Sequence, residues 1–291
     1  MKLTVPDYIS SITPYSPGKP LEELEREYGI RDSIKLASNE NPLGPSPMAI
    51  AAIADALKDL NRYPDAGGHY LVRGISDRLG VEPGNVVLGN GSDEILGLLA
   101  QAFLSPGSEV ILPRPSFLMY DILVRSAGAK AIYVPLQSLS IDTEAIADRV
   151  TENTRMVFLT NPNNPTGTII SKADFQRFLG ATPPNTIVVI DEAYIEFVRD
   201  TSCMNSMDFF SEDRALVILR TFSKAYGLAG LRIGYGIMPI QIAELLNRIR
   251  LPFNANSLAQ VGALAALQDE AFLQQSVHLV HEGLDFMAGA L

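Results

Sequence analysis

From Val86 onward, short apolar runs alternate with longer segments of helical period. The runs are rich in β-branched residues, and strands that alternate with helices predict crossover connections and a mainly parallel sheet. Strands are expected at residues 86–88, 109–112, 131–134, 156–160, 186–190, 215–219 and 233–237. The predicted fold class is therefore α/β, with a seven-stranded sheet flanked by helices.

The segments between these strands carry apolar residues at helical spacing. Helices are expected at 93–103, 117–126, 143–150, 172–179 and 239–249. Ser92 precedes Asp93 and Glu94, so its hydroxyl is expected to cap the first free amides of the helix that follows. The end of the chain, 256–291, is rich in Ala and Leu and predicts a further helix.

Prolines interrupt the first 45 residues, at positions 6, 14, 17, 20, 42 and 45. They leave one charged stretch of helical character at 21–28. Because proline favours turns and loops over strands, this part of the chain is expected to form an arm outside the sheet.

Composition narrows the class of protein. Hydrophobic residues make up 47% and charged residues 19% of the 291 positions, which is typical of a folded globular chain. The formal net charge is −10 without a basic stripe, so nucleic-acid binding is not expected. No run of about 18 apolar residues occurs, and Pro6 and Asp7 interrupt the start, so neither a membrane span nor an export signal is expected.

Cysteine and histidine are scarce. The single cysteine, Cys203, has no partner for an internal disulfide, which is compatible with a cytoplasmic protein. The three histidines are His69, His278 and His281, too few and too scattered to suggest a multi-histidine metal centre. No metal is expected.

The first chemical candidate is an acidic residue at the end of a strand. The apolar segment 188–190 leads to Asp191, and Tyr194 follows three residues later. Open α/β sheets bind ligands at this edge. Asp191 there could be a magnesium ligand, a ribose acceptor, a helix cap or the partner of a protonated ring nitrogen.

The second candidate is Lys224, which follows the expected strand at 215–219. Thr221, Ser223 and Arg232 surround it in the sequence, and hydroxyls with a forked guanidinium suit a phosphate dianion. Burial near a cation lowers a lysine pKa, as a lysine that bonds covalently to a carbonyl requires. The alternative is a lysine that only binds phosphate.

Two turns complete the set of candidates. The glycine-rich turn 89–94 opens a helix, so its free amides and the helix dipole favour an anion. The turn at 160–167 presents Asn164 as a side-chain donor, although its composition is equally typical of a tight loop.

Together these residues identify a resemblance to the class I and II aminotransferases, enzymes of fold type I that use pyridoxal phosphate (PLP). The likeness runs from about residue 34 through 260 and is closest to the branch that acts on histidinol phosphate. Its motifs are ASNENP at 37–42, NRYPD at 61–65, GNGSDE at 89–94, NNPTG at 163–167, DEAY at 191–194, SK at 223–224 and GLR at 230–232.

The resemblance implies a role for each candidate. Lys224 would carry PLP and shuttle the substrate proton, and Asp191 would keep the pyridine nitrogen protonated. Tyr194 and Asn164 would bond to the ring hydroxyl oxygen. Phe117 would stack on the ring, with Tyr120 a weaker candidate for that place and ordinary core packing the alternative for Phe117.

Other residues would hold the phosphate and the substrate. The implied phosphate site consists of Ser92, Asp93, Thr221, Ser223 and Arg232. Tyr63 would reach the phosphate of a neighbouring subunit, so a homodimer is expected. Asn41 would contact the substrate, where the arm near 39–41 closes.

The implied reaction moves an amino group between histidinol phosphate and 2-oxoglutarate, in histidine biosynthesis. The alternatives are a threonine-phosphate decarboxylase, an aromatic aminotransferase, or a non-catalytic chain that only binds PLP. A nucleotide-binding protein is disfavoured, because the turn at 89–94 lacks the lysine and hydroxyl ending of a P-loop.

The resemblance also implies a domain organisation. Residues 1–45 are expected to be an arm with part of a small domain, 46–255 a large PLP-binding domain, and 256–291 a helix leading toward a small domain that is largely absent. The arginine that holds the substrate carboxylate in this family would lie in that absent part, and 260–291 contains no Arg or Lys. We expect a shortened chain in which cofactor binding is intact and substrate binding is incomplete.

Overall fold

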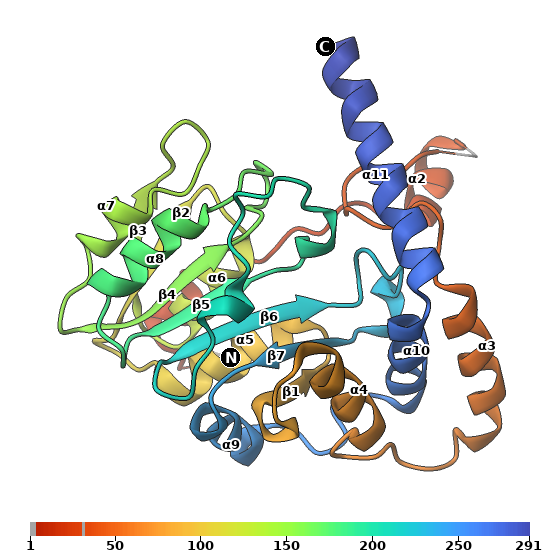
Figure 1. The fold of residues 1–291 in the computed structure, drawn as a ribbon, viewed down its shortest axis with the longest axis horizontal. Helices are drawn as coiled ribbons and strands as arrows, with labels where there is room; N and C mark the ends of the chain where they lie inside the picture. The colour runs from red at the N-terminus through yellow and green to blue at the C-terminus, as the bar shows by residue number, and fades with distance from the viewer. Residues whose placement is uncertain (1–3, 31–32) are drawn as a thin grey trace.

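In the computed structural model, which describes residues 4–30 and 33–291, seven strands form one sheet in the order β1-β7-β6-β5-β4-β2-β3 (Figure 1). The strands are β1 Val86–Gly89, β2 Glu109–Arg114, β3 Lys130–Pro135, β4 Thr154–Thr160, β5 Ile187–Asp191, β6 Leu216–Thr221 and β7 Gly234–Ile237. All seven predicted strands are confirmed, and so is the α/β class.

The strands from β2 to β6 pair in parallel, whereas β7 pairs antiparallel with both β6 and β1. The connection from β6 to β7 explains the reversal. A parallel neighbour needs a crossover, usually a helix, but this connection contains only the short 3-10 turn η5 (Ala229–Leu231). The connection instead forms a loop at the sheet edge, and that loop carries Lys224.

The helices are α1 Asp7–Ser10, α2 Leu21–Tyr28, α3 Pro47–Ala56, α4 His69–Leu79, α5 Ser92–Phe103, α6 Leu118–Ser126, α7 Thr143–Ala147, α8 Lys172–Ala181, α9 Ile240–Ile249, α10 Ser257–Gln268 and α11 Glu270–Ala290. The predicted helices are confirmed, with α7 shorter than expected and 256–291 divided into two helices at Asp269. Neither α3 nor α4 was predicted.

The capping role predicted for Ser92 is wrong. Gly91 is the N-cap of α5 and Ser92 is its first helical residue, with no side-chain cap hydrogen bond. Gly91 has φ of 78°, a conformation that glycine adopts without strain. The first amides of α5 are therefore left open to another partner.

Helices cover both faces of the sheet, because side chains of the buried strands alternate between two apolar cores. In β4, Val157 and Leu159 join the core built with α4, α7, α8 and α10, while Met156 and Phe158 join the core built with α5, α6 and α9. The result is a three-layer arrangement in which polar residues at the strand ends remain free to form a site.

The N-terminal arm around Asn41 meets helix α11 beside the sheet. Helix α11 is packed on the body through Phe272 and Leu273, and Asp285 further along pairs with Arg199. Only the end of the helix extends away from the body, with the C-terminus at its tip (Figure 1). The amide of Asn41 donates to Ala225 O (3.1 Å) and Ser276 Oγ (2.9 Å), which ties the N-terminal arm to the lysine loop and to α11. Within the described residues, no helix has the length and apolar character needed to span a membrane.

Candidate active site

Two adjoining cavities lie where the parallel strands β4, β5 and β6 end. They measure about 360 and 520 Å³ and share Asn39, Asn164, Tyr194 and Lys224 in their walls. The smaller cavity brings together most of the predicted cofactor residues, namely Ser92, Asp93, Phe117, Asn164, Asp191, Tyr194, Thr221, Ser223, Lys224 and Arg232.

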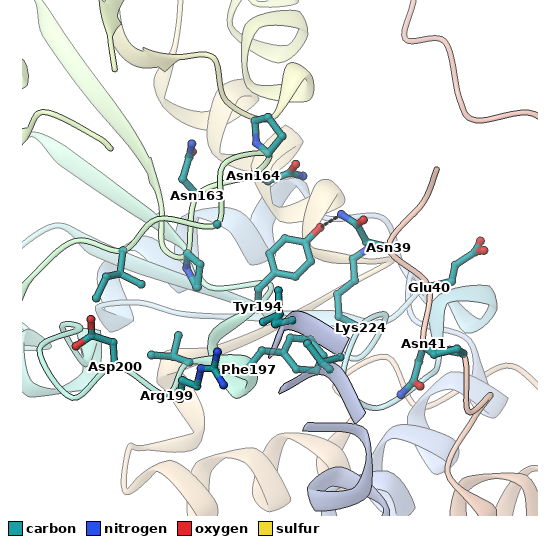
Figure 2. Close-up of a pocket in the computed structure, with 18 residues that line it drawn as sticks. Asn39, Glu40, Asn41, Asn163, Asn164, Tyr194, Phe197, Arg199, Asp200 and Lys224 are labelled. Atoms are coloured by element: carbon teal, nitrogen blue, oxygen red, sulfur yellow. Dashed lines mark hydrogen bonds between the residues drawn. The ribbon is translucent and has the colours of Figure 1, made fainter. Parts of the chain in front are cut away.

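Lys224 stands between the two cavities. Its Nζ donates to Ser38 O (3.1 Å) and lies 5.6 Å from the centre of the Tyr194 ring (Figure 2). Burial lowers the pKa of Lys224, and the nearby Arg232 lowers it further, while Glu40, Asp93 and Asp191 act in the opposite direction. The amine is thus half-buried, held by one carbonyl and closer to its neutral form than a surface lysine.

Asp191 is the last residue of β5 and is 5% exposed. Its carboxylate accepts hydrogen bonds from Tyr120 Oη (2.7 Å) and from the amide of Ala193 (3.1 Å). Burial raises the pKa of Asp191 to about 6, because the two hydrogen bonds offset only part of the desolvation. A buried carboxylate of this kind is poised to pair with a cationic group in the cavity.

A phosphate cradle lies at the start of α5. The uncapped amides of the helix meet the hydroxyls of Ser92, Thr221 and Ser223 at the cavity wall. Arg232 adds its guanidinium, with Nη1 3.4 Å from Ser223 Oγ and Nη2 3.8 Å from Asp93 Oδ2. Because Asp93 carries a carboxylate, its contribution to an anion site comes from the backbone amide.

Two glycines keep this cradle open. A Cβ at Gly91 would come within 2.4 Å of Arg232 Nη2, and one at Gly234 would come within 2.5 Å of the Ser92 amide. Any other residue at these positions would fill the space where an anion meets the helix terminus. The spacing of motifs indicated the turn at 89–94, but the role of Gly234 on β7 was not foreseen.

Tyr194 faces the smaller cavity with a hydroxyl that accepts from Asn39 Nδ2 (3.1 Å), as the dashed line in Figure 2 marks. Burial raises the pKa of Tyr194, and the Asn39 hydrogen bond offsets part of that rise. Asn164 lines the same wall. Asn39 was expected only as part of the arm near 39–41, and its contact with Tyr194 was not predicted.

Phe117 and Tyr120 also line the smaller cavity, in edge-to-face contact with ring centroids 5.5 Å apart. Phe117 is half-buried, whereas Tyr120 is 1% exposed and stacks on Phe158 at 4.9 Å. The ring of Tyr120 is thus committed to the core, which favours Phe117 for stacking on a cofactor.

Asn41 lines the larger cavity together with Asn39, Glu40 and residues of α11. Both protons of its amide are engaged, by Ala225 O and Ser276 Oγ, and its Oδ1 accepts from the Leu43 amide. These bonds give Asn41 a structural role in holding the arm. Its predicted contact with a substrate stays a prediction.

Tyr63 lies outside both cavities. Its side chain belongs to the surface, 83% exposed, and its ring stacks on Phe253 at 4.7 Å. Within one chain, Tyr63 therefore does not join the other predicted cofactor residues.

Next to Asp191, a buried ion pair links Glu192 to Arg220 of β6. Arg220 Nε and Nη2 both lie 2.8 Å from Glu192 Oε2, and Ser206 Oγ donates to the other oxygen of the carboxylate. Glu192 is fully buried. The pair fixes the end of β5 against its neighbour, and no sequence signal pointed to it.

These features fit PLP. The uncapped helix, hydroxyls and Arg232 suit its phosphate, Asp191 suits its ring nitrogen, and Lys224 suits its aldehyde. The two glycines leave room for the phosphate that a Cβ would occupy.

Comparison with known proteins agrees with this interpretation. The sequence family described as aminotransferase class I and II matches residues 31–291. A histidinol-phosphate aminotransferase of Moorella thermoacetica is 48% identical over 98% of this chain and 75% of its own length. One of Desulfotalea psychrophila is 47% identical over 99% of this chain and 76% of its own length.

Among solved structures, the chain is similar to a histidinol-phosphate aminotransferase from Sinorhizobium meliloti in complex with pyridoxal-5'-phosphate. The TM-score is 0.86 at 31% identity, over 93% of this chain and 72% of the other.

Proposed function

The chain belongs to the class I and II aminotransferases, which use PLP, and from that premise we propose that it transfers the amino group of histidinol phosphate to 2-oxoglutarate. The observation that carries the proposal is the convergence of Lys224, Asp191, Tyr194 and a phosphate cradle on one cavity. The two histidinol-phosphate aminotransferases, at 48% and 47% identity, support the choice of substrate.

PLP, when bound, supplies a ring that accepts the electrons left on the substrate carbon after its proton departs. The residues of the chain prepare the site for that chemistry. Asp191 would accept a hydrogen bond from the protonated ring nitrogen, and Tyr194 with Asn164 would bond to the ring hydroxyl oxygen. Ser92, Thr221, Ser223 and Arg232 would anchor the phosphate, and Phe117 would cover one face of the ring.

Lys224 has two tasks in this proposal. Its Nζ would be the attachment point of the cofactor, and once the substrate amine displaced it, the same nitrogen could carry the proton from the substrate carbon to the carbon of the cofactor to which the lysine had been attached. Both tasks need a neutral amine, which the lowered pKa of Lys224 favours.

The larger cavity is the proposed substrate chamber. It opens directly beside Lys224, and its volume of about 520 Å³ lies within the range of small-molecule sites. Amide side chains of Asn39, Asn163 and Asn164 line it and can orient a polar substrate.

The test is the visible absorption of the purified chain with PLP. We expect a band that is absent in Lys224→Ala and that changes to the amino form of the cofactor on addition of histidinol phosphate. Adding 2-oxoglutarate should then restore the original band. Lys172→Ala is the matched control, because Lys172 is exposed and pairs with Asp208 outside the site.

Two results would contradict the proposal at different levels. A band that does not depend on Lys224 would remove the lysine from its assigned place. A Lys224-dependent band that ignores histidinol phosphate but responds to threonine phosphate with release of carbon dioxide would replace the transaminase with the decarboxylase.

We also propose that the chain acts as a cytoplasmic homodimer, in which Tyr63 reaches the cofactor phosphate of the neighbouring subunit. The support is an aromatic surface beside the site. Tyr63 and Phe253 stack, Leu251 nearby is 70% exposed, and Arg250 joins the two segments by donating to Ala66 O. Exposed aromatic residues of this kind are typical of the centre of a protein interface.

The division into an arm (1–45), a large domain (46–255) and a helical segment (256–291) stays a prediction.

A further inference from the structure

Tyr120 has a buried hydroxyl that the proposed chemistry does not use. It lies on the third residue of α6, one helical turn from Phe117, and its side chain is 1% exposed. Its Oη donates to Asp191 Oδ2 (2.7 Å) and lies 3.0 Å from Thr160 Oγ1. A buried hydroxyl with two short hydrogen bonds is costly to place unless both bonds form.

The direction of these bonds follows from chemistry. An ionised carboxylate only accepts hydrogen bonds, so Tyr120 donates a hydrogen bond to Asp191. The hydroxyl of Thr160 must then donate a hydrogen bond to the oxygen of Tyr120. Thr160 Oγ1 is also 3.2 Å from Ser116 Oγ, at the wall of the same cavity. A donor that itself accepts a hydrogen bond is strengthened, so the bond to Asp191 gains from its neighbour.

Tyr120 is the only side chain that an identified hydrogen bond joins to the Asp191 carboxylate within the described residues; the other donor is the Ala193 amide. The charged groups around Asp191 are Asp93 and Glu192, which disfavour its charge, and Lys224, which it attracts. Removing the Tyr120 hydroxyl would leave a buried carboxylate with one hydrogen bond and two acidic neighbours.

The ring of Tyr120 also supports Phe117, the residue proposed to stack on the cofactor ring. It packs edge-to-face against Phe117 (5.5 Å) and is itself held by stacking on Phe158 (4.9 Å). One side chain thus touches both the carboxylate and the aromatic ring assigned to the pyridine.

We propose that Tyr120 is a positioning residue for PLP, which keeps the Asp191 carboxylate ionised and aimed at the ring nitrogen while supporting Phe117 against the ring face. This inference rests on the place of Asp191 in the proposed function. Tyr120 itself does not touch the reacting atoms.

The test is Tyr120→Phe, which removes one oxygen and keeps both ring contacts. The carboxyl of Asp191 is followed by ¹³C NMR in the cofactor-free chain, with Asp191→Asn to assign the signal. Loss of one hydrogen bond to a charged group should weaken the acid roughly tenfold or more. In the PLP-bound chain, the resonance of a ¹⁵N-labelled ring nitrogen should move toward its unprotonated position.

Tyr133→Phe is the matched control. Tyr133 also donates to an aspartate, Asp121, but on the surface and outside the cavities, so its loss should leave both signals in place. Thr160→Val is the second variant if Tyr120→Phe fails to fold. It removes the partner of Tyr120 and should shift both signals in the same direction by a smaller amount.

Unchanged signals in a folded Tyr120→Phe chain would overturn the inference. A raised pKa of Asp191 with an unchanged ¹⁵N resonance of the ring nitrogen would also overturn it. The hydrogen bond from Tyr120 would then serve packing alone. If PLP does not bind through Lys224 in the parent chain, the proposed function fails, and the carboxyl titration still decides whether Tyr120 controls Asp191.

Discussion

Asp191 is buried at the end of β5, and its folded-state pKa of about 6 lies above the ordinary value of 3.8. The native chain therefore binds a proton more readily than the unfolded chain. Its stability falls as pH rises from about 4 through 6, and the full cost remains above that range. A cationic ring nitrogen would remove this cost, so the site is less stable without its cofactor than with it.

Asp191→Asn should consequently stabilise the cofactor-free chain at pH 8 by up to about 3 kcal/mol, from a shift of about two pKa units at about 1.4 kcal/mol each. The gain should shrink as pH falls toward 4. Urea unfolding at several pH values measures it. Asp208→Asn is the control, since Lys172 lowers the pKa of Asp208 and this variant should lose stability at neutral pH. Equal stability of parent and Asp191→Asn at pH 8 would refute the argument.

Individual site residues could be predicted from the sequence where they belong to a motif. Lys224, Asp191 and Arg232 were each predicted, and the structure places them at one cavity. The partners that tune them were not predicted, because Tyr120 reaches Asp191 and Asn39 reaches Tyr194 across 71 and 155 positions of the sequence. Such contacts depend on how strands and helices pack, and spacing along the chain does not encode them.

Among the elements, the turn before α5 is the one on which the phosphate cradle depends. Gly91 combines a φ of 78° with an approach to Arg232 that leaves no room for a Cβ. Gly107 has a similar φ of 97° but nothing within 4 Å of its Cβ position. A substitution at Gly107 would therefore show the effect of backbone strain alone. The same substitution at Gly91 would add the displacement of Arg232.

Gly91→Ala should reduce PLP affinity at least tenfold, because Arg232 must move from the cradle, and should cost roughly 1–2 kcal/mol of stability. Gly107→Ala should show a comparable stability cost with unchanged affinity. Fluorescence titration with PLP and urea unfolding provide the two measurements. If both variants bind PLP as the parent does, the close approach at Gly91 has no bearing on the cofactor.

Element prediction succeeded where a pattern repeated. The β-branched strands and the helices between them were found, but α3 and α4 were missed, and 256–291 was expected as one helix where Asp269 separates two. Ser46 caps α3 and Pro47 stands at its start, which are recognisable start signals. The proline-rich arm just before them obscured the change from loop to helix.

For the molecule as a whole, the stacked pair of Tyr63 and Phe253 is the feature that a single chain does not explain. The pair lies at the surface, with Tyr63 83% exposed. In the proposed homodimer, this surface would be buried and the Tyr63 hydroxyl would lie at the partner's cofactor. The ring of Tyr63 would then contribute to the contact between subunits, and its hydroxyl would contribute to phosphate binding.

Sedimentation equilibrium should give about twice the 31.6 kDa of one chain. Tyr63→Ala should weaken the dimer, whereas Tyr63→Phe should leave the dimer intact and lower PLP affinity about tenfold, as expected for one lost hydrogen bond to a phosphate. Tyr28→Ala, at an exposed tyrosine of the arm, should change neither quantity. A monomeric parent chain would contradict the proposal.

The place of β7 has a consequence for how the protein is made. Within the described sheet, β1 pairs with β7 alone, so Val86–Gly89 leaves the ribosome well before the strand that receives it. Until Gly234–Ile237 emerges, β1, which leads into the turn that begins α5, lacks the strand that joins it to the rest of the sheet. We therefore expect cofactor capture late in synthesis, and a nascent chain stalled before residue 234 should be unable to retain PLP.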